Sequence, residues 1–250
     1  MKRIIAALLS FIPIVLVVFF YEGNSLRSPS SQSIRHIVFD LDGTLVESLG
    51  MNSIGGDIVL DSGEAYHVFD HARQLVERAY RDGLQIHFYS GGPNARNLDL
   101  LSKLKLSNGK SFSDIASNIL GREDLVDLGE QFEGKFFTDR YRKDLSKIAP
   151  LDQLVIIEDN RFFPLDEAQR SRVVELPIHK ESSLKVWRSE NRLSWVHGVF
   201  DQVISGKDLK DINSKNINQN IIHVLEFLGE NINDNLSRHG CAGIFYSLAF

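Results

Sequence analysis

The sequence has few of the residues that mark several common classes of protein. Its 250 residues include one cysteine, Cys241, so the chain cannot form an internal disulfide or a cysteine-rich zinc site. The net charge is −5, and no basic stripe is interleaved with aromatic residues, which argues against a nucleic-acid partner. Trp187, Trp195 and the histidines form no ligand cluster. What remains is a chain with 43% hydrophobic residues, enough for one sizeable core, and we expect a monomer.

One long apolar run lies at the N-terminus. Ile4–Phe20 carries no charge and follows Lys2 and Arg3, a pattern typical of an export signal or a membrane anchor. Positive charges before the run favour an N-terminus that stays in the cytoplasm, although small residues up to Ser25 allow cleavage there. We expect residues 1–23 to be a signal anchor or signal peptide and 24–33 a serine-rich linker. The protein is then membrane-anchored, the reading we favour, or exported if the segment is cleaved.

A short apolar strand that ends in two acids is the most informative part of the sequence. His36–Phe39 has strand character, and Asp40 and Asp42 follow it before a turn at Gly43. A run that is polar only at its carboxyl end is typical of a central parallel strand that delivers side chains to a ligand site. Because residues i and i+2 of an extended segment point to the same side, the two carboxylates can face one ligand.

This spacing suits nucleophilic and acid–base chemistry on a phosphate ester. One carboxylate can attack phosphorus to give an acyl phosphate, while the other protonates the leaving oxygen and later activates water. Gly43 allows a tight turn, and the Thr44 hydroxyl can hold the nucleophile or contact the substrate. The alternative is an ordinary solvated turn after a strand, since short motifs also match by chance.

The segment Asp40–Leu45 resembles the first motif of the haloacid dehalogenase (HAD) superfamily, most of whose members are phosphatases with an aspartate nucleophile. The resemblance implies that Asp40 is the nucleophile and that Asp42 is the general acid and base. Dehalogenases of this superfamily lack the second acid, so Asp42 disfavours dehalogenation. Three further motifs follow in the expected order, and the resemblance extends over roughly residues 34–177.

The second and third motifs supply groups that bind phosphate and neutralise charge. Leu84–Tyr89 is an apolar strand that ends in Ser90 and Gly91, where a hydroxyl and backbone N–H groups would bind a phosphate oxygen. By itself this pattern is also a common turn. In the third motif, Lys143 would offset charge on the nucleophile and the phosphoryl group. Arg122 is a further candidate for a substrate contact, or only a surface charge.

The fourth motif is an apolar strand with an acidic end, Leu154–Asn160. The resemblance implies that Asp159 and Asn160 bind Mg²⁺ together with a carboxylate oxygen of Asp40 and the backbone carbonyl of Asp42. These are the hard oxygen ligands that Mg²⁺ prefers.

Within the superfamily, Lys143-Asp144-Leu145 followed by this strand looks like the branch of small C-terminal-domain phosphatases, which act on phosphoproteins. Gly43 departs from that branch, where a bulkier polar residue is usual. Glu158 is ambiguous, because it can point into the core edge of its strand or replace one of the metal ligands.

The remaining pattern predicts a doubly wound, Rossmann-like α/β fold with a mostly parallel sheet and a minimal cap. We expect the HAD-like core at residues 34–180 and a helical C-terminal extension, packed on that core, at 181–250. The elements expected within this frame are a flap hairpin over Gly55–Val68, helices over Phe69–Asp82 and Asn94–Leu106, a strand closing at Leu120–Glu123, a fifth strand at Val173–Pro177, and helical stripes at Leu193–Val203 and Ile221–Leu228.

These features together predict a Mg²⁺-dependent phosphatase that hydrolyses phosphomonoesters through an aspartyl phosphate. Because the intervals between motifs leave no room for a large cap, and uncovered sites in the superfamily tend to take macromolecules, the expected substrate is a phosphorylated protein. A sugar or nucleotide phosphatase is the enzymatic alternative. A catalytically inactive, membrane-tethered binding module is the non-enzymatic alternative.

Overall fold

The computed structural model describes residues 33–132, 134, 136–176 and 185–214. The expected N-terminal anchor and linker, the stripe at Ile221–Leu228 and the apolar C-terminus lie outside these ranges, apart from the linker's last residue, Ser33. Within them, no helix is long and apolar enough to cross a membrane.

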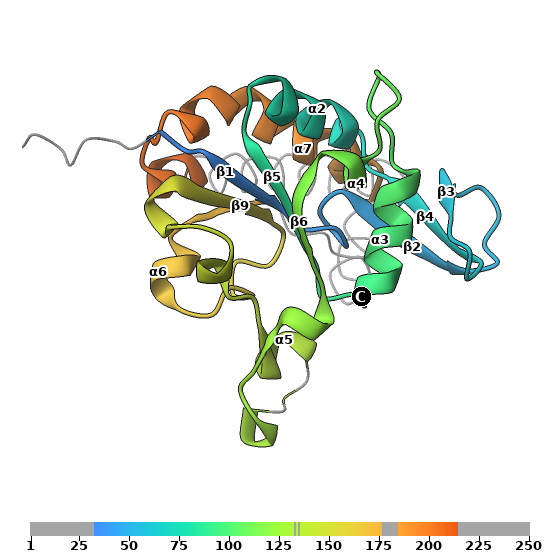
Figure 1. The fold of residues 1–250 in the computed structure, drawn as a ribbon, viewed down its shortest axis with the longest axis horizontal. Helices are drawn as coiled ribbons and strands as arrows, with labels where there is room; N and C mark the ends of the chain where they lie inside the picture. Colours follow the sequence, from blue (N-terminus) through green and yellow to red (C-terminus); the bar gives the residue numbers. More distant parts are fainter. Residues whose placement is uncertain (1–32, 133, 135, 177–184, 215–250) are drawn as a thin grey trace, which may run out of the picture. The chain divides into compact units, whose positions relative to one another are not determined.

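Five parallel strands form the central sheet, in the order β10–β9–β1–β5–β6 (Figure 1). β1 pairs with β5 on one side and with β9 on the other, so the strand that precedes the two acids is central, as expected. The order reverses between β1 and β9, and α/β sheets bind ligands at the carboxyl ends of strands beside such a reversal. The strands are β1 (His36–Phe39), β5 (Gln85–Tyr89), β6 (Ala116–Leu120), β9 (Leu154–Glu158) and β10 (Val173–Glu175).

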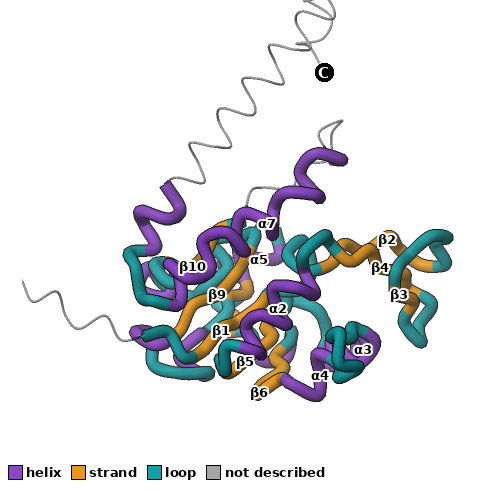
Figure 2. The backbone as a smooth tube through the Cα atoms, turned by 90° about the horizontal axis from the view of Figure 1, so that it is seen from above, coloured by secondary structure: helices purple, strands orange, loops and turns teal. Residues whose placement is uncertain are grey.

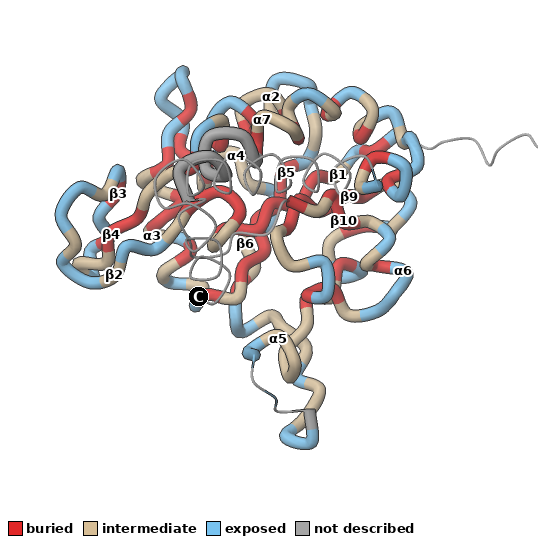
Figure 3. Tube along the Cα trace, turned by 180° about the vertical axis from the view of Figure 1, so that it is seen from behind, coloured by how far each residue is buried: buried red, intermediate tan, exposed pale blue. Residues whose placement is uncertain are grey.

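Both faces of the sheet are buried at β1 and β9, which explains why these two strands are almost continuously apolar. Ile37 and Phe39 of β1 face a large core to which several helices contribute, whereas Val38 faces a smaller cluster that contains Leu145. Figure 3 shows buried backbone concentrated in the central strands, and Figure 2 shows the helices around them. The longest helices of the large core are α2 (Ala72–Arg81), α3 (Asn94–Lys103) and α7 (Lys185–Ile204).

A second, antiparallel sheet with the order β2–β4–β3 follows β1 and forms a small flap. β3 and β4 are the hairpin that the sequence predicts. The sequence does not predict β2, because this segment carries Ser48 and Gly50 and pairs across an irregular register. The flap strands are β2 (Val46–Met51), β3 (Ile58–Val59) and β4 (Glu64–Val68). A cap of this size agrees with the minimal cap expected.

Charged side chains fasten the flap to α3. Lys103 Nζ lies 2.6 Å from the Asp61 carboxylate at the hairpin turn and 2.7 Å from Asp99 on its own helix. The backbone N–H of Asp61 also donates to Asp99 Oδ2 at 2.8 Å. Individual exposed ion pairs contribute little stability, but this shared network fixes where the turn sits relative to α3.

Helix α7 packs on α2 along the stripe that the sequence predicts, from Leu193 to Val203. Arg78 of α2 donates to Asp201 at 2.6 Å, and its guanidinium carbon lies 4.8 Å from the ring centroid of Phe200. Residues 209–214 are again helical.

Several boundaries differ from the prediction for local reasons. α3 ends at Lys103 rather than at Leu106, because the backbone of Leu104 is extended. α2 begins at Ala72 rather than at Phe69, because His71 adopts a left-handed backbone (φ 64°) that a helix cannot contain. The strand expected to close at residues 120–123 ends at Leu120, and Arg122 opens a 3₁₀ turn instead. The remaining short elements are α4 (Phe112–Ile115), η1 (Arg122–Asp124), β7 (Val126–Asp127), η2 (Glu130–Phe132), α5 (Phe137–Arg140), β8 (Tyr141–Arg142), η3 (Leu145–Lys147), η4 (Leu151–Gln153) and α6 (Glu167–Arg170).

Candidate active site

Asp40 occupies the first position after β1, at the floor of a cleft. Its backbone N–H donates to the carbonyl of Ile157, so the pairing of β1 with β9 continues up to the acid itself. The Asp40 side chain is only 4% exposed, and each of its carboxylate oxygens accepts one hydrogen bond. Lys143 Nζ donates to Oδ1 at 2.6 Å, and the Thr44 hydroxyl donates to Oδ2 at 3.2 Å. Asp40 is therefore held in one orientation by two buried donors.

Lys143 is fully buried between two acids. Its ammonium lies 2.6 Å from Asp40 and 2.6 Å from Glu158. The side chain also runs under the ring of Phe163, with Nζ 4.5 Å from the ring centroid. The lysine directly follows β8, and its backbone pairs with Phe163 and Leu165 in the loop after β9. Chain segments far apart in sequence thus place one cation between two carboxylates.

Burial and crowding shift the pKa values of all three groups. Burial raises the pKa of Asp40 to about 6, with Lys143 opposing the shift and Asp159 adding to it. Burial, together with the neighbouring Asp40, raises the pKa of Glu158 well above its usual range. For Lys143, burial acts to lower the pKa, but the two carboxylates outweigh it and the pKa is raised. The Lys143 ammonium is therefore charged, but this single positive charge is too little to stabilise both carboxylates in their ionised form.

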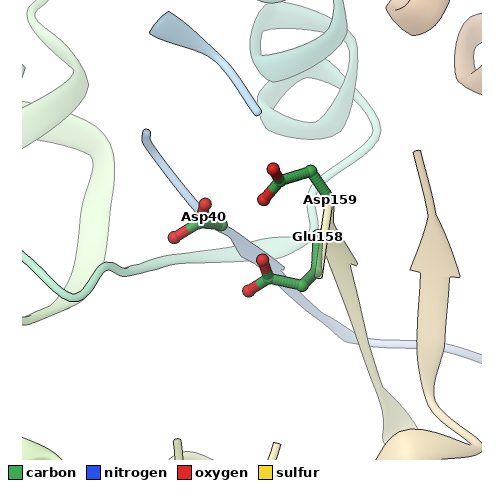
Figure 4. Close-up of side chains that lie close together, drawn as sticks. All are labelled: Asp40, Glu158 and Asp159. Atoms are coloured by element: carbon green, nitrogen blue, oxygen red, sulfur yellow. The ribbon is translucent and has the colours of Figure 1, made fainter. Parts of the chain in front are cut away.

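Asp159 brings a third carboxylate to the same place. Oxygens of Asp40, Glu158 and Asp159 all lie within 4.8 Å of one another, and Figure 4 shows the three side chains pointing toward a common space. With all three acids ionised, one ammonium leaves a formal excess of two negative charges. A divalent cation would balance that excess, and three carboxylates are hard oxygen donors of the kind that Mg²⁺ binds. The residues present therefore fit Mg²⁺.

The structure places Glu158, rather than Asn160, in the cluster of candidate metal ligands. Asn160 lines the cleft, but its side-chain oxygen accepts from the backbone N–H of Phe162 at 3.1 Å and its amide donates to Thr138 at 3.4 Å. Glu158, the second choice from sequence, lies inside the carboxylate cluster, and its Oε1 accepts from the Asn160 N–H at 3.0 Å. The backbone carbonyl of Asp42 belongs to the peptide that leads into Gly43, and Gly43 lies against the Asp159 carboxylate.

Asp42 is held on the other side of the cleft. The guanidinium of Arg96 donates to both carboxylate oxygens, at 3.0 Å and 2.5 Å, and the Ser90 hydroxyl donates to Oδ2 at 2.9 Å. Ser90 Oγ in turn accepts from the backbone N–H of Gly92 at 3.2 Å. Asp42 and Ser90, two of the residues expected at the site, are thus in direct contact.

The cleft above these groups has a volume of about 690 Å³. Its floor contains Asp40, Asp42 and Ser90, with Gly91 beside them. Thr44 and Lys143 do not line it, because both are fully buried behind Asp40. Its walls come from the flap, through Met51, Ser62, Glu64 and Tyr66, and from the opposite side, through Arg122, Phe137, Thr138 and Phe163.

Arg122 lies at the rim of this cleft. Its Nε donates to the carbonyl of Gly91 at 3.1 Å, and its guanidinium carbon lies 5.2 Å from the ring centroid of Phe137. The residue is exposed. Its position fits either of the roles that the sequence left open.

Sequence reasoning missed Arg96. It lies in the first turn of α3, where the helix dipole disfavours a cation and where no acidic residue stands. A cation at the N-terminal end of a helix, six residues after Ser90, indicates that an acidic group from another part of the chain lies nearby and balances its charge. Here that anion is Asp42.

No family model matches this sequence, and no curated protein is similar to it in sequence. The fold is similar to those of solved phosphatases. One is a predicted phosphoglycolate phosphatase from Haemophilus somnus 129PT, with 13% identity, a TM-score of 0.39, and coverage of 58% of this chain and 86% of that one. Another is the RNA polymerase II CTD phosphatase Fcp1 of fission yeast, with 14% identity, a TM-score of 0.41, and coverage of 83% and 66%. A third is the N-terminal part of protein BF1531 from Bacteroides fragilis, which contains a phosphatase domain and is complexed with Mg, with 16% identity, a TM-score of 0.39, and coverage of 66% and 39%.

Proposed function

We propose that this protein is a Mg²⁺-dependent phosphatase that hydrolyses phosphomonoesters through an aspartyl phosphate on Asp40. One observation carries the proposal. The Asp40 carboxylate, oriented by Lys143 and Thr44, lies at the floor of a cleft whose other polar groups include the paired Asp42 and Ser90. A nucleophile, an acid–base group and a hydroxyl donor therefore share one small volume, which is the constellation that phosphoryl transfer needs.

The reaction divides into two displacements. In the first, a carboxylate oxygen of Asp40 attacks phosphorus, the bond to the leaving oxygen breaks, and Asp42 gives that oxygen a proton. In the second, Asp42 takes a proton from water as the water oxygen attacks phosphorus, and the bond to Asp40 breaks. The fixed ammonium of Lys143 stabilises negative charge near Asp40 throughout.

The carboxylates of Asp40, Asp159 and Glu158 and the backbone carbonyl of Asp42 are the groups that would hold Mg²⁺. When bound, the ion would supply positive charge that stabilises the negative charge developing during phosphoryl transfer. Lys143 contacts both Asp40 and Glu158 at 2.6 Å and so fixes the positions of two of these carboxylates.

Hydrolysis of p-nitrophenyl phosphate by the full chain tests this proposal. We expect activity that needs Mg²⁺, disappears with EDTA, and falls at least about 1,000-fold in Asp40→Asn. Asp70→Asn, an exposed acid outside the cleft, is the matched control and should retain wild-type activity. An inactive wild type with Mg²⁺ present, or an active Asp40→Asn, would refute the mechanism and favour a binding module.

For the substrate, a phosphorylated protein is favoured over a small phosphate ester. The flap covers only one side of the cleft, and apolar side chains stand exposed on both walls, Met51 at 61% and Phe137 at 40%. Such a rim suits a polypeptide with side chains on either side of the phosphate, whereas a small substrate would leave these groups in water. Comparison of phosphopeptides with sugar and nucleotide phosphates by kcat/KM decides between the two, and preference for the small esters would overturn this assignment.

The proposed location is a membrane, reached through the apolar segment after Lys2 and Arg3. Retention of the full chain in a carbonate-washed membrane fraction is the expected result. Recovery of a shortened chain in the soluble, exported fraction would indicate a cleaved signal peptide instead.

A further inference from the structure

Arg96 and Ser90 direct their donors at the same atom. Arg96 Nη2 lies 2.5 Å from Asp42 Oδ2, and Ser90 Oγ lies 2.9 Å from it. Arg96 Nη1 contacts the other oxygen of the same carboxylate at 3.0 Å. A guanidinium fork with two parallel N–H bonds matches a phosphate as well as a carboxylate. The Asp42 carboxylate therefore occupies a position built for an oxyanion.

The two partners differ in freedom to move. The Asp42 side chain is 41% exposed, whereas that of Arg96 is 17% exposed. Arg96 lies with its guanidinium carbon 5.7 Å from the ring centroid of Tyr66, and its guanidinium fills the space where a side chain at Gly92 would begin. When an anion enters the cleft, the carboxylate can swing away while the fork stays.

We propose that Arg96 is a ligand of the substrate's phosphoryl group. On binding, the phosphoryl group would displace the Asp42 carboxylate from the Arg96 guanidinium. This inference rests on the proposed function and adds a second phosphate-binding side chain to Ser90. Asp42, once displaced, is free to face the leaving oxygen. Gly92 then has a specific role, since it leaves room for the guanidinium beside the Ser90 loop.

Steady-state kinetics on p-nitrophenyl phosphate, with inorganic phosphate as inhibitor, tests the proposal. In Arg96→Ala we expect the KM for the ester and the Ki for phosphate to rise together, by about 10- to 100-fold, because a charge-assisted bidentate contact is lost. Arg96→Lys should recover part of this loss, and added guanidinium should partly rescue Arg96→Ala. Arg73→Ala, an exposed arginine on α2, is the matched control and should behave as wild type.

Gly92→Ala provides a variant that leaves Arg96 in the sequence. The three atoms nearest to the added Cβ all belong to the Arg96 guanidinium, so the fold should persist while the guanidinium is displaced, and KM and Ki should rise as in Arg96→Ala. Gly198→Ala, with nothing within 4 Å of the added atom, is the control and should change neither constant.

If KM and Ki stay within about twofold of wild type and kcat alone falls, Arg96 only positions Asp42, and the proposal is wrong. Calorimetric titration with inorganic phosphate separates this failure from failure of the proposed function, because it needs no turnover. Weaker phosphate binding by Arg96→Ala than by wild type supports the anion site even in an inactive protein. Equal binding by the two overturns it.

Discussion

Gly43 lies directly against the Asp159 carboxylate: a Cβ at position 43 would be 2.6 Å from Asp159 Oδ2. Gly43 also has a φ of +78°, which side-chain-bearing residues rarely adopt. The glycine thus serves the turn after Asp42 and the placement of a candidate metal ligand at once. Position 43 is a point where the first and fourth motifs touch.

Gly43→Ala should therefore impair Mg²⁺ binding beyond its cost in stability. We expect about 1–2 kcal/mol of destabilisation from the strained φ, and at least a tenfold weaker Mg²⁺ affinity because Asp159 must move. Gly83→Ala is a matched control, since Gly83 has a φ of +76° and nothing within 4 Å of an added Cβ. Denaturant unfolding and Mg²⁺ titration of both variants measure the two effects. Equal Mg²⁺ affinity in both would show that Asp159 is not a ligand.

Asp40→Asn should stabilise the metal-free protein at alkaline pH. Because the folded pKa of Asp40 is raised to about 6, protonated Asp40 stabilises the fold below pH 4, and this contribution is lost as the pH rises through about 6. The asparagine stays neutral, so we expect a gain on the order of 1–3 kcal/mol at pH 8 and none at pH 4. Thermal unfolding in EDTA measures it. A variant less stable than wild type at pH 8 would show that Lys143 dominates the balance.

Mg²⁺ binding should weaken in acid. The charged groups that face Asp40 are Lys143, Asp42 and Asp159, with Glu158 across the ammonium. Since the ion competes with protons for carboxylates whose pKa values are raised, and that of Asp40 is about 6, its affinity should fall at least about tenfold per pH unit below 6. Isothermal titration across pH 5–8 gives this slope. A flat profile would place the ion on other groups.

Lys143→Met should destabilise the fold strongly. It removes the ammonium shared by two buried carboxylates, and leaving a buried charge uncompensated costs about 3–5 kcal/mol. Adding Glu158→Gln should return part of that stability, because one of the two stranded carboxylates is then neutral. Chemical denaturation of the two single variants and the double variant measures the coupling free energy. Additive losses would mean that the ammonium and Glu158 are energetically independent.

Much of this architecture is predictable because its signals are local. An apolar run ending in Asp40 predicts a central strand, and a pair of short runs around Asp61 predicts a hairpin. The left-handed backbone of His71 and the irregular strand β2 carry no such pattern. The role of Arg96 is also not predictable, because its partner Asp42 is 54 residues away in sequence and only the packing of the fold brings the two together.

The lysine that neutralises Asp40 is 103 residues further along the chain. A site assembled from such distant strands depends on contacts that form slowly, because the chain entropy of closing the intervening loop must be overcome first. A nascent polypeptide that has not yet reached Lys143 contains the proposed nucleophile without its counter-charge. The proposed activity should therefore begin only once β9 and the loops around Lys143 have been synthesised and docked, so that turnover would report completed folding.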